Sequence, residues 1–161
     1  MAIDYNPCAQ KVAEMGYEYA RSMNAEICIV HAIGDIAYYF MEYSPIMGFE
    51  GFGPDYSFKI IKEQANEAKR YLEAVVKHLA DSTIKTRVLD GKTADAILKY
   101  AVEYKADLIV MGALTRHGFE KVLGDVSAEV LKNAEIPVLI IPADKLDPGL
   151  LSKKQCMLQY I

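Results

Sequence analysis

The stretch "DLIVMGALTRHGFEKVLGDVS", residues 107–127, holds the pattern that decides the fold. Residues 107–112 are nearly all apolar, which is typical of a buried strand in a parallel sheet. Gly112 ends this run, a loop with Gly118 and Gly124 follows, and a helical pattern then runs from Val126 to Ala134. A strand, a glycine-containing loop and a helix start in this order predict an anion site at the helix N-terminus, where backbone amides and the helix dipole favour negative charge.

The same alternation of short apolar runs and long helical patterns extends in both directions from this stretch. The expected strands are residues 2–4, 26–32, 83–89, 107–112 and 137–142. The first expected helix begins at Asn6 and Pro7, and the second runs from Ser57 to Leu79. The third follows Thr93 as its cap, and the fourth runs from Val126 to Ala134. Strand and helix in strict alternation predict an α/β fold, namely a single doubly wound domain with a mostly parallel sheet and helices on both faces.

Two of these helices have an apolar face that should pack on the sheet. In the first helix the expected buried positions are Cys8, Val12, Met15, Tyr19 and Met23. In the second they are Ile61, Ala65, Ala68, Leu72, Val75, Val76 and Leu79.

Composition narrows the class of protein. The chain has 161 residues, enough for one ordinary domain, and a formal net charge of −4. An acidic chain is a poor partner for nucleic acid or for an anionic membrane, since either favours a basic surface. It has no apolar run of 18 residues and no signal-peptide pattern, so we expect a cytoplasmic protein. Its three cysteines are scattered, as expected of isolated buried thiols in a reducing compartment.

Motifs for catalysis and for metal binding are missing from the sequence. The "DGKT" at 90–93 lacks the first glycine of a P-loop, and the turn after residues 2–4 lacks the glycines that NAD and FAD require. His31, His78 and His117 have no spacing that indicates zinc. We therefore expect no catalytic residues, no metal site and no enzymatic activity.

Two segments depart from the alternation. Residues 33–56 form a long connection rich in tyrosine, phenylalanine, glycine and proline. They form either a surface loop over its own aromatic cluster, or a lid or dimer contact at the carboxyl edge of the sheet. The tail 143–161 ends in "CMLQYI", whose apolar side chains should dock on the protein.

Four stretches, in this order and spacing, make the chain resemble the universal stress proteins. They are "AIDYNPCAQKVAEMGYEYA" at 2–20, "IVHA" at 29–32, "ADLIVMG" at 106–112 and "VLGDVSAEVLKNAEIPVLIIP" at 122–142. The resemblance covers residues 1–142. It implies a five-stranded doubly wound domain with strand order 3-2-1-4-5, usually dimeric and linked to survival under stress.

The resemblance also implies a nucleotide site. ATP-binding members carry G-x2-G-x9-G-(S/T) after the fourth strand, which places Gly112 at the first glycine and Gly124 at the third. Asp4 matches the acidic residue that ends the first strand. The expected nucleotide-binding set is Ala2, Ile3, Asp4, Ala32, Met111, Gly112, Thr115, Arg116, Gly124, Asp125 and Val126.

This chain departs from that motif in three ways. Thr115 replaces the second glycine, the spacer 116–123 has eight residues, and Asp125 replaces the final hydroxyl. A branched residue where close backbone approach is needed costs on the order of 1 kcal/mol. As a helix N-cap, Asp125 would accept the amide hydrogen bonds that a phosphate uses, and at about 4 Å it would repel the phosphate by roughly 1 to 4 kcal/mol. In the opposite sense, Arg116, His117 and Lys121 would attract phosphate, and Asp125 would serve as a ligand for Mg²⁺.

The predicted first strand is short for a central position. Only "MAID" is present, whereas members of the family usually have several more residues before the matching aspartate. Either further residues precede Met1, or another segment covers the gap.

The predicted function is that of a universal stress protein-like, cytoplasmic stress-response protein that acts through dimer or partner contacts, with a degenerate adenine-nucleotide site and no resident cofactor. The alternative is a sensor that binds ATP or AMP, with or without Mg²⁺, through the 111–127 loop. Strand 137–142 should lie at a sheet edge and join a homodimer, since an unpaired apolar edge seeks a partner. The sequence does not identify a protein partner.

Overall fold

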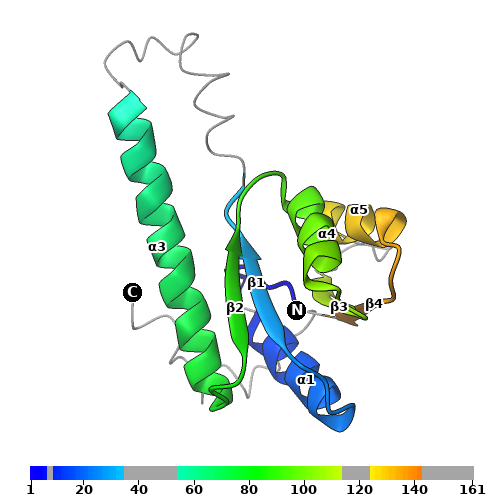
Figure 1. The fold of residues 1–161 in the computed structure, drawn as a ribbon. Helices are drawn as coiled ribbons and strands as arrows, with labels where there is room; N and C mark the ends of the chain where they lie inside the picture. The colour runs from blue at the N-terminus through cyan, green and yellow to red at the C-terminus, as the bar shows by residue number, and fades with distance from the viewer. Residues whose placement is uncertain (7–8, 35–53, 114–123, 143–161) are drawn as a thin grey trace.

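The computed structural model describes residues 1–6, 9–34, 54–113 and 124–142, and its elements alternate as predicted (Figure 1). In chain order they are α1 (Ala9–Ser22), β1 (Cys28–Ala32), α3 (Pro54–Leu79), β2 (Lys85–Leu89), α4 (Thr93–Tyr104), β3 (Ile109–Ala113), α5 (Asp125–Asn133) and β4 (Val138–Pro142). Most of the predicted 33–56 connection, the middle of the 111–127 loop and the 143–161 tail lie outside the described residues.

The strands form two parallel ladders that meet at the amino-terminal segment. β1 pairs with β2 and β3 pairs with β4. Between the ladders, Ala2 bridges Val30 of β1 and Met111 of β3, both in parallel. The Ala2 amide donates to the Val110 carbonyl at 2.8 Å, and the Ile3 amide donates to the Val30 carbonyl at 3.0 Å. The described residues therefore run across the sheet as β2, β1, Ala2, β3 and β4.

The strand predicted at residues 2–4 is thus a single-residue bridge. The Val30 amide donates to the Met1 carbonyl at 2.8 Å, and after Ile3 the chain bends at Tyr5 and Asn6 towards α1. A strand needs several consecutive paired residues, and only Ala2 has a partner on both sides. The five-stranded order 3-2-1-4-5 accordingly stays a prediction at its central strand.

Helices cover both faces of these ladders. Because successive strand residues point to opposite faces, Ile29 packs in a cluster with Leu72 and Val75 of α3, whereas Val30 packs in a second cluster with Ile97 of α4. The first cluster also contains Val12 and Ala13 of α1, and the second contains Val130 of α5. Figure 1 shows α3 on one side of β1 and β2, with α4 and α5 on the other.

The predicted apolar face of α3 is confirmed from Ala68 to Leu79, whereas Ile61 and Ala65 are only half-buried, and the predicted face of α1 is partly wrong. Ala68, Leu72 and Val75 are fully buried on α3. On α1 the buried residues are Ala9, Val12, Ala13 and Gly16, while Tyr19 is 45% exposed and Met23, beyond the helix end, is 56% exposed. The strands are only five residues long, so the last turn of α1 extends past the sheet that would have covered it.

Both predicted helix caps are displaced by one residue. Lys92 is the N-cap of α4, and Thr93 is its first helical residue. Gly124 is the N-cap of α5, with extended backbone angles (φ −59°, ψ 152°), and Asp125 begins the helix. Neither cap residue makes a side-chain hydrogen bond to its helix. Asp125 therefore does not occupy the N-cap position, and the competition for amides that its carboxylate was expected to exert is not seen.

Two properties of the described residues bear on the class of protein. No helix in the described ranges has the length and apolar character that crossing a membrane requires. Cys28 is buried and unpaired, as expected of an isolated structural thiol.

Candidate functional site

A cavity of about 280 Å³ lies at the carboxyl ends of β1 and β3. Its lining residues are Ala2, Ile3, Asp4, Asn6, Ala9, Val12, Val30, His31, Ala32, Thr93, Ile97, Met111, Gly112, Val126 and Ser127. On one side of the cavity the chain passes from β1 to its neighbour β2, and on the other side it passes from β3 to its neighbour β4. In doubly wound sheets the place where neighbouring crossovers diverge is the usual position of a ligand cleft.

Residues 2–6 form the floor of the cavity and are held from below by α3. Ile3 is buried, and the carboxylate of Asp4 accepts a hydrogen bond from the Asn6 amide at 3.1 Å. The Tyr71 hydroxyl of α3 donates to the Asp4 carbonyl at 2.6 Å. Burial, with the nearby Asp4 charge, raises the pKa of Tyr71, so the hydroxyl stays protonated and able to donate.

An aromatic group supports the same floor. His31, only 5% exposed, has its Nδ1 atom 2.8 Å from the Ile3 carbonyl. A carbonyl can only accept, so Nδ1 carries the proton. The His31 ring lies 4.4 Å from the Tyr5 ring, and Tyr5 lies 4.8 Å from Tyr71, measured between ring centroids. His31 therefore lies near the end of β1 with a hydrogen bond to the floor of the cavity.

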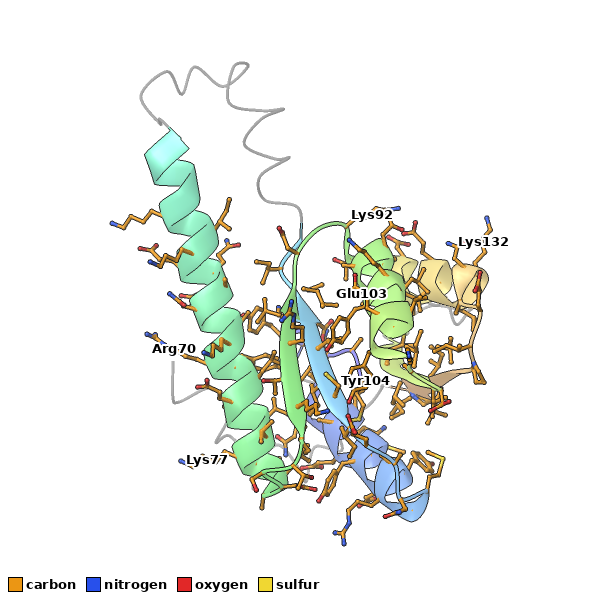
Figure 2. The ribbon with its side chains drawn as sticks, viewed as in Figure 1. Arg70, Lys77, Lys92, Glu103, Tyr104 and Lys132 are labelled. Carbon is orange, nitrogen blue, oxygen red and sulfur yellow. The ribbon has the colours of Figure 1, made fainter. Side chains whose placement is uncertain are left out.

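The opposite wall consists of the amino-terminal turns of α4 and α5. Thr93 and Ile97 come from α4, and Val126 and Ser127 come from α5. Two helix N-termini therefore border one cavity, and each carries a partial positive charge. Lys92 forms an ion pair with Glu129 that joins the two helices, and Figure 2 shows Lys92 at the start of α4.

Ser127 ties α5 to the end of β3. Its hydroxyl donates to the Gly112 carbonyl at 2.9 Å, and Ser127 is buried. We expect Ser127→Ala to lower the free energy of unfolding by roughly 1 to 3 kcal/mol, because the Gly112 carbonyl loses its donor at a partly buried position. Urea denaturation measures the change. Ser22→Ala is the control, since the Ser22 hydroxyl bonds an exposed carbonyl within α1. Equal effects of the two substitutions would contradict the structural role of Ser127.

The structure brings together most of the residues predicted for the site. Those that line the cavity are Ala2, Ile3, Asp4, Ala32, Met111, Gly112 and Val126. Gly124 and Asp125 precede Val126 but do not line the cavity, and Asp125 is exposed. Thr115 and Arg116 lie outside the described residues.

Sequence reasoning missed several lining residues, of which Thr93 and Ser127 carry hydroxyl groups. Thr93 follows the expected strand 83–89, and the rule that carboxyl ends of parallel strands meet at one edge would have placed it here. Ser127 lies two residues after Asp125 in "GDVS", so a hydroxyl is still present at the start of the helix.

The chemistry of the lining suits binding more than catalysis. Most lining residues are apolar, and five polar residues, Asp4, Asn6, His31, Thr93 and Ser127, also line the cavity. This composition is typical of small-molecule sites. Among the described residues, no three His, Cys, Asp or Glu side chains lie close enough to hold a metal ion.

Comparison with known proteins identifies the family. The sequence model of the universal stress protein family matches residues 1–142. The chain belongs to the universal stress protein family. A universal stress protein of Methanocaldococcus jannaschii is 32% identical to it, with 88% of this chain and 79% of the relative covered. One from Thermus aquaticus is also 32% identical, with 88% and 95% covered.

Solved structures of universal stress proteins share the fold. The protein UspA from Lactobacillus plantarum superposes with a TM-score of 0.67 at 22% identity, with 87% of this chain and 93% of that chain covered. A universal stress protein solved in complex with cAMP has a TM-score of 0.54 at 24% identity, with 89% and 94% covered. The family and the α/β fold expected from the sequence are thereby confirmed.

Proposed function

We propose that this universal stress protein is a cytoplasmic, non-enzymatic stress-response protein that binds an adenine nucleotide weakly in the cavity and acts through contacts with a second copy and with a partner. The observation that carries the proposal is the cavity itself. It brings together most of the nucleotide-binding residues that the family resemblance implies, and Val126 and Ser127 at the start of α5 line it.

The inner part of the cavity suits a base. Ile3, Val30 and Met111 are buried and apolar, and Ala32 presents only a methyl group. Ligand sites usually measure roughly 300 to 1,000 Å³, so a cavity of about 280 Å³ lies at the small end. It suits a nucleoside better than a whole triphosphate. Phosphates would extend out of the cavity towards α5.

A negative charge at the start of α5 weakens the binding of phosphate there. Asp125 is exposed in the first turn of α5, and its carboxylate does not cap that turn. The obstacle to phosphate binding that we infer is therefore repulsion between this carboxylate and the phosphate. For an exposed, solvent-screened pair this amounts to about 1 kcal/mol.

A related protein supports the ligand class. The universal stress protein of TM-score 0.54 was solved with cAMP, which contains adenine, ribose and one phosphate. A ligand with a single phosphate would suit this chain, because its cavity is small and Asp125 repels phosphate at the start of α5.

Calorimetric titration with AMP and ATP, each with and without Mg²⁺, tests the proposal. We expect AMP to bind at least as tightly as ATP, because the added phosphates meet the Asp125 charge and gain no enclosed site. Mg²⁺ should change neither affinity by more than a fewfold. Tight binding of ATP that depends on Mg²⁺ would contradict the proposal and would favour a functional ATP sensor with Asp125 as metal ligand.

We expect Asp125→Ser to raise the affinity for AMP about fivefold. The reason is the loss of about 1 kcal/mol of charge repulsion, since each 1.4 kcal/mol is tenfold in Kd. The matched control is Glu103→Ser, which makes the same change of charge near the far end of α4, roughly 15 Å along the helix from Thr93 (Figure 2). An equal gain from both substitutions would show that only net charge matters.

Dimerisation through residues 137–142 remains part of the proposal. β4 pairs with β3 on one side and lies at the edge of its ladder among the described strands. An apolar edge strand gains hydrogen bonds by pairing with a second copy around a two-fold axis. We expect sedimentation at micromolar concentration to give a dimer, and Ile140→Lys to give a monomer. A wild-type monomer at that concentration would contradict this mode of assembly.

A further inference from the structure

The cavity proposed for the nucleotide has no cation in its described lining. Of the lining side chains that the structure describes, none belongs to a lysine or an arginine, and Asp4 contributes a negative charge. A phosphate monoester carries between one and two negative charges at neutral pH. A phosphate beside this lining would therefore be stabilised by a positive group that reaches it from just outside the cavity.

Lys92 places a positive charge at the edge of the cavity. It is the N-cap of α4, and Thr93, the next residue, lines the cavity. Figure 2 shows Lys92 at the start of α4, and its side chain is 62% exposed. A lysine ammonium stands on a flexible four-carbon stem, so an exposed one can change its hydrogen-bond partner while the helix stays in place.

The Lys92 ammonium contacts carboxylates of both helices that border the cavity. It donates a hydrogen bond to Glu129 of α5, and the Asp95 carboxylate lies 3.9 Å from the same nitrogen. Glu129 lies four residues after Asp125, and residues four apart share one face of a helix, with about 6 Å between their Cβ atoms. The ammonium therefore lies against the face of α5 whose first turn is the proposed position of the phosphate.

We propose that Lys92 exchanges Glu129 for the phosphate of a nucleoside monophosphate, and that this exchange makes the cavity prefer the phosphorylated ligand to the free nucleoside. This role rests on the proposed binding of an adenine nucleotide, and it adds the side chain that recognises the phosphate. Exposed pairs of single charges contribute little to stability, whereas a phosphate monoester offers up to two charges and three acceptor oxygens. Once the base places the phosphate beside α5, the phosphate is the stronger partner for Lys92.

Titration calorimetry with AMP and adenosine tests this role of Lys92. Lys92→Gln should weaken AMP about fivefold, through the loss of one screened charge pair, and should leave adenosine within about twofold of wild type. Lys92 makes no capping hydrogen bond, so the substitution leaves the start of α4 intact. The matched control is Lys132→Gln, which makes the same change of charge in the last turn of α5 (Figure 2) and should leave both affinities within about twofold of wild type.

A double-mutant cycle with Glu129→Gln separates contact with the phosphate from neutralisation of Glu129. Because Glu129 competes for the lysine and also repels phosphate, Glu129→Gln should raise the affinity for AMP. Adding Lys92→Gln to this variant should then weaken AMP by at least about fivefold. A lysine that only neutralises Glu129 would have no effect once that carboxylate is gone. Equal AMP affinities of Glu129→Gln and the double variant would therefore overturn the proposal.

Adenosine distinguishes failure of this role from failure of the proposed function. If the wild-type chain binds adenosine and AMP, and Lys92→Gln changes neither affinity, the role of Lys92 alone is overturned. An equal loss for both ligands would also overturn it, because the substitution would then act through the packing of α4. A wild-type chain that binds neither ligand would overturn the proposed function together with the role of Lys92.

Discussion

Replacing Ala32 with phenylalanine should abolish adenine-nucleotide binding, lowering the affinity at least about 100-fold, or about 2.7 kcal/mol. Ala32 ends β1 and lines the cavity of about 280 Å³ opposite the apolar residues of β3. A benzyl group there would occupy the space assigned to the base. Titration calorimetry with AMP measures the loss.

The control for this substitution is Ala74→Phe, at an exposed position on α3. It adds the same ring away from the cavity and should leave the affinity unchanged. Overpacking at Ala32 is expected to cost about 1 to 3 kcal/mol of stability, so circular dichroism should verify that the variant is folded. Wild-type affinity in a folded Ala32→Phe protein would show that the nucleotide binds elsewhere.

The largest loss of stability is expected from Leu72→Ala, at about 2 to 5 kcal/mol. Leu72 is 1% exposed and packs with Ile29 and Val75 between α3 and the strands. Removing its side chain leaves a cavity in the cluster through which the carboxyl-terminal half of α3 packs on the strands. Urea denaturation measures the difference.

Glu73→Ala is the matched control, because Glu73 is the next residue on α3 and is exposed. Its effect should stay within about 0.5 kcal/mol. A loss below about 1 kcal/mol for Leu72→Ala would mean that α3 is held mainly by other contacts, such as the hydrogen bond from Tyr71 to Asp4.

The sequence predicted most elements of the fold because hydrophobic periodicity reports burial. The stripe on α3 and the runs at 26–32 and 107–112 place their residues on the faces that the structure buries. Periodicity reports nothing about where the covering sheet ends. That is why Tyr19 was predicted to be buried, although it lies beyond the short strands.

The site was predicted in part, through the family motif. Ala32, Met111 and Gly112 line the cavity as the resemblance implied. Thr93 and Ser127 come from helices whose positions depend on tertiary packing, which a motif does not include. The prediction that Asp125 is the N-cap was wrong because a one-residue shift of the helix start converts an N-cap into a first-turn residue, and sequence patterns locate helix ends only to within one or two residues.

Because the Tyr71 hydroxyl is hydrogen-bonded to the Asp4 carbonyl, a movement of residues 2–6 at the floor of the cavity is coupled to a movement of α3. From Tyr71 to Pro54 the helix extends for seventeen residues, or about 26 Å, and Figure 1 shows its amino-terminal half reaching past the strands. A tilt of about 5° at Tyr71 would therefore displace the amino-terminal end of α3 by on the order of 2 Å. A movement of residues 2–6 too small to change the shape of the cavity would thus produce a larger displacement at the amino-terminal end of α3, far from the ligand.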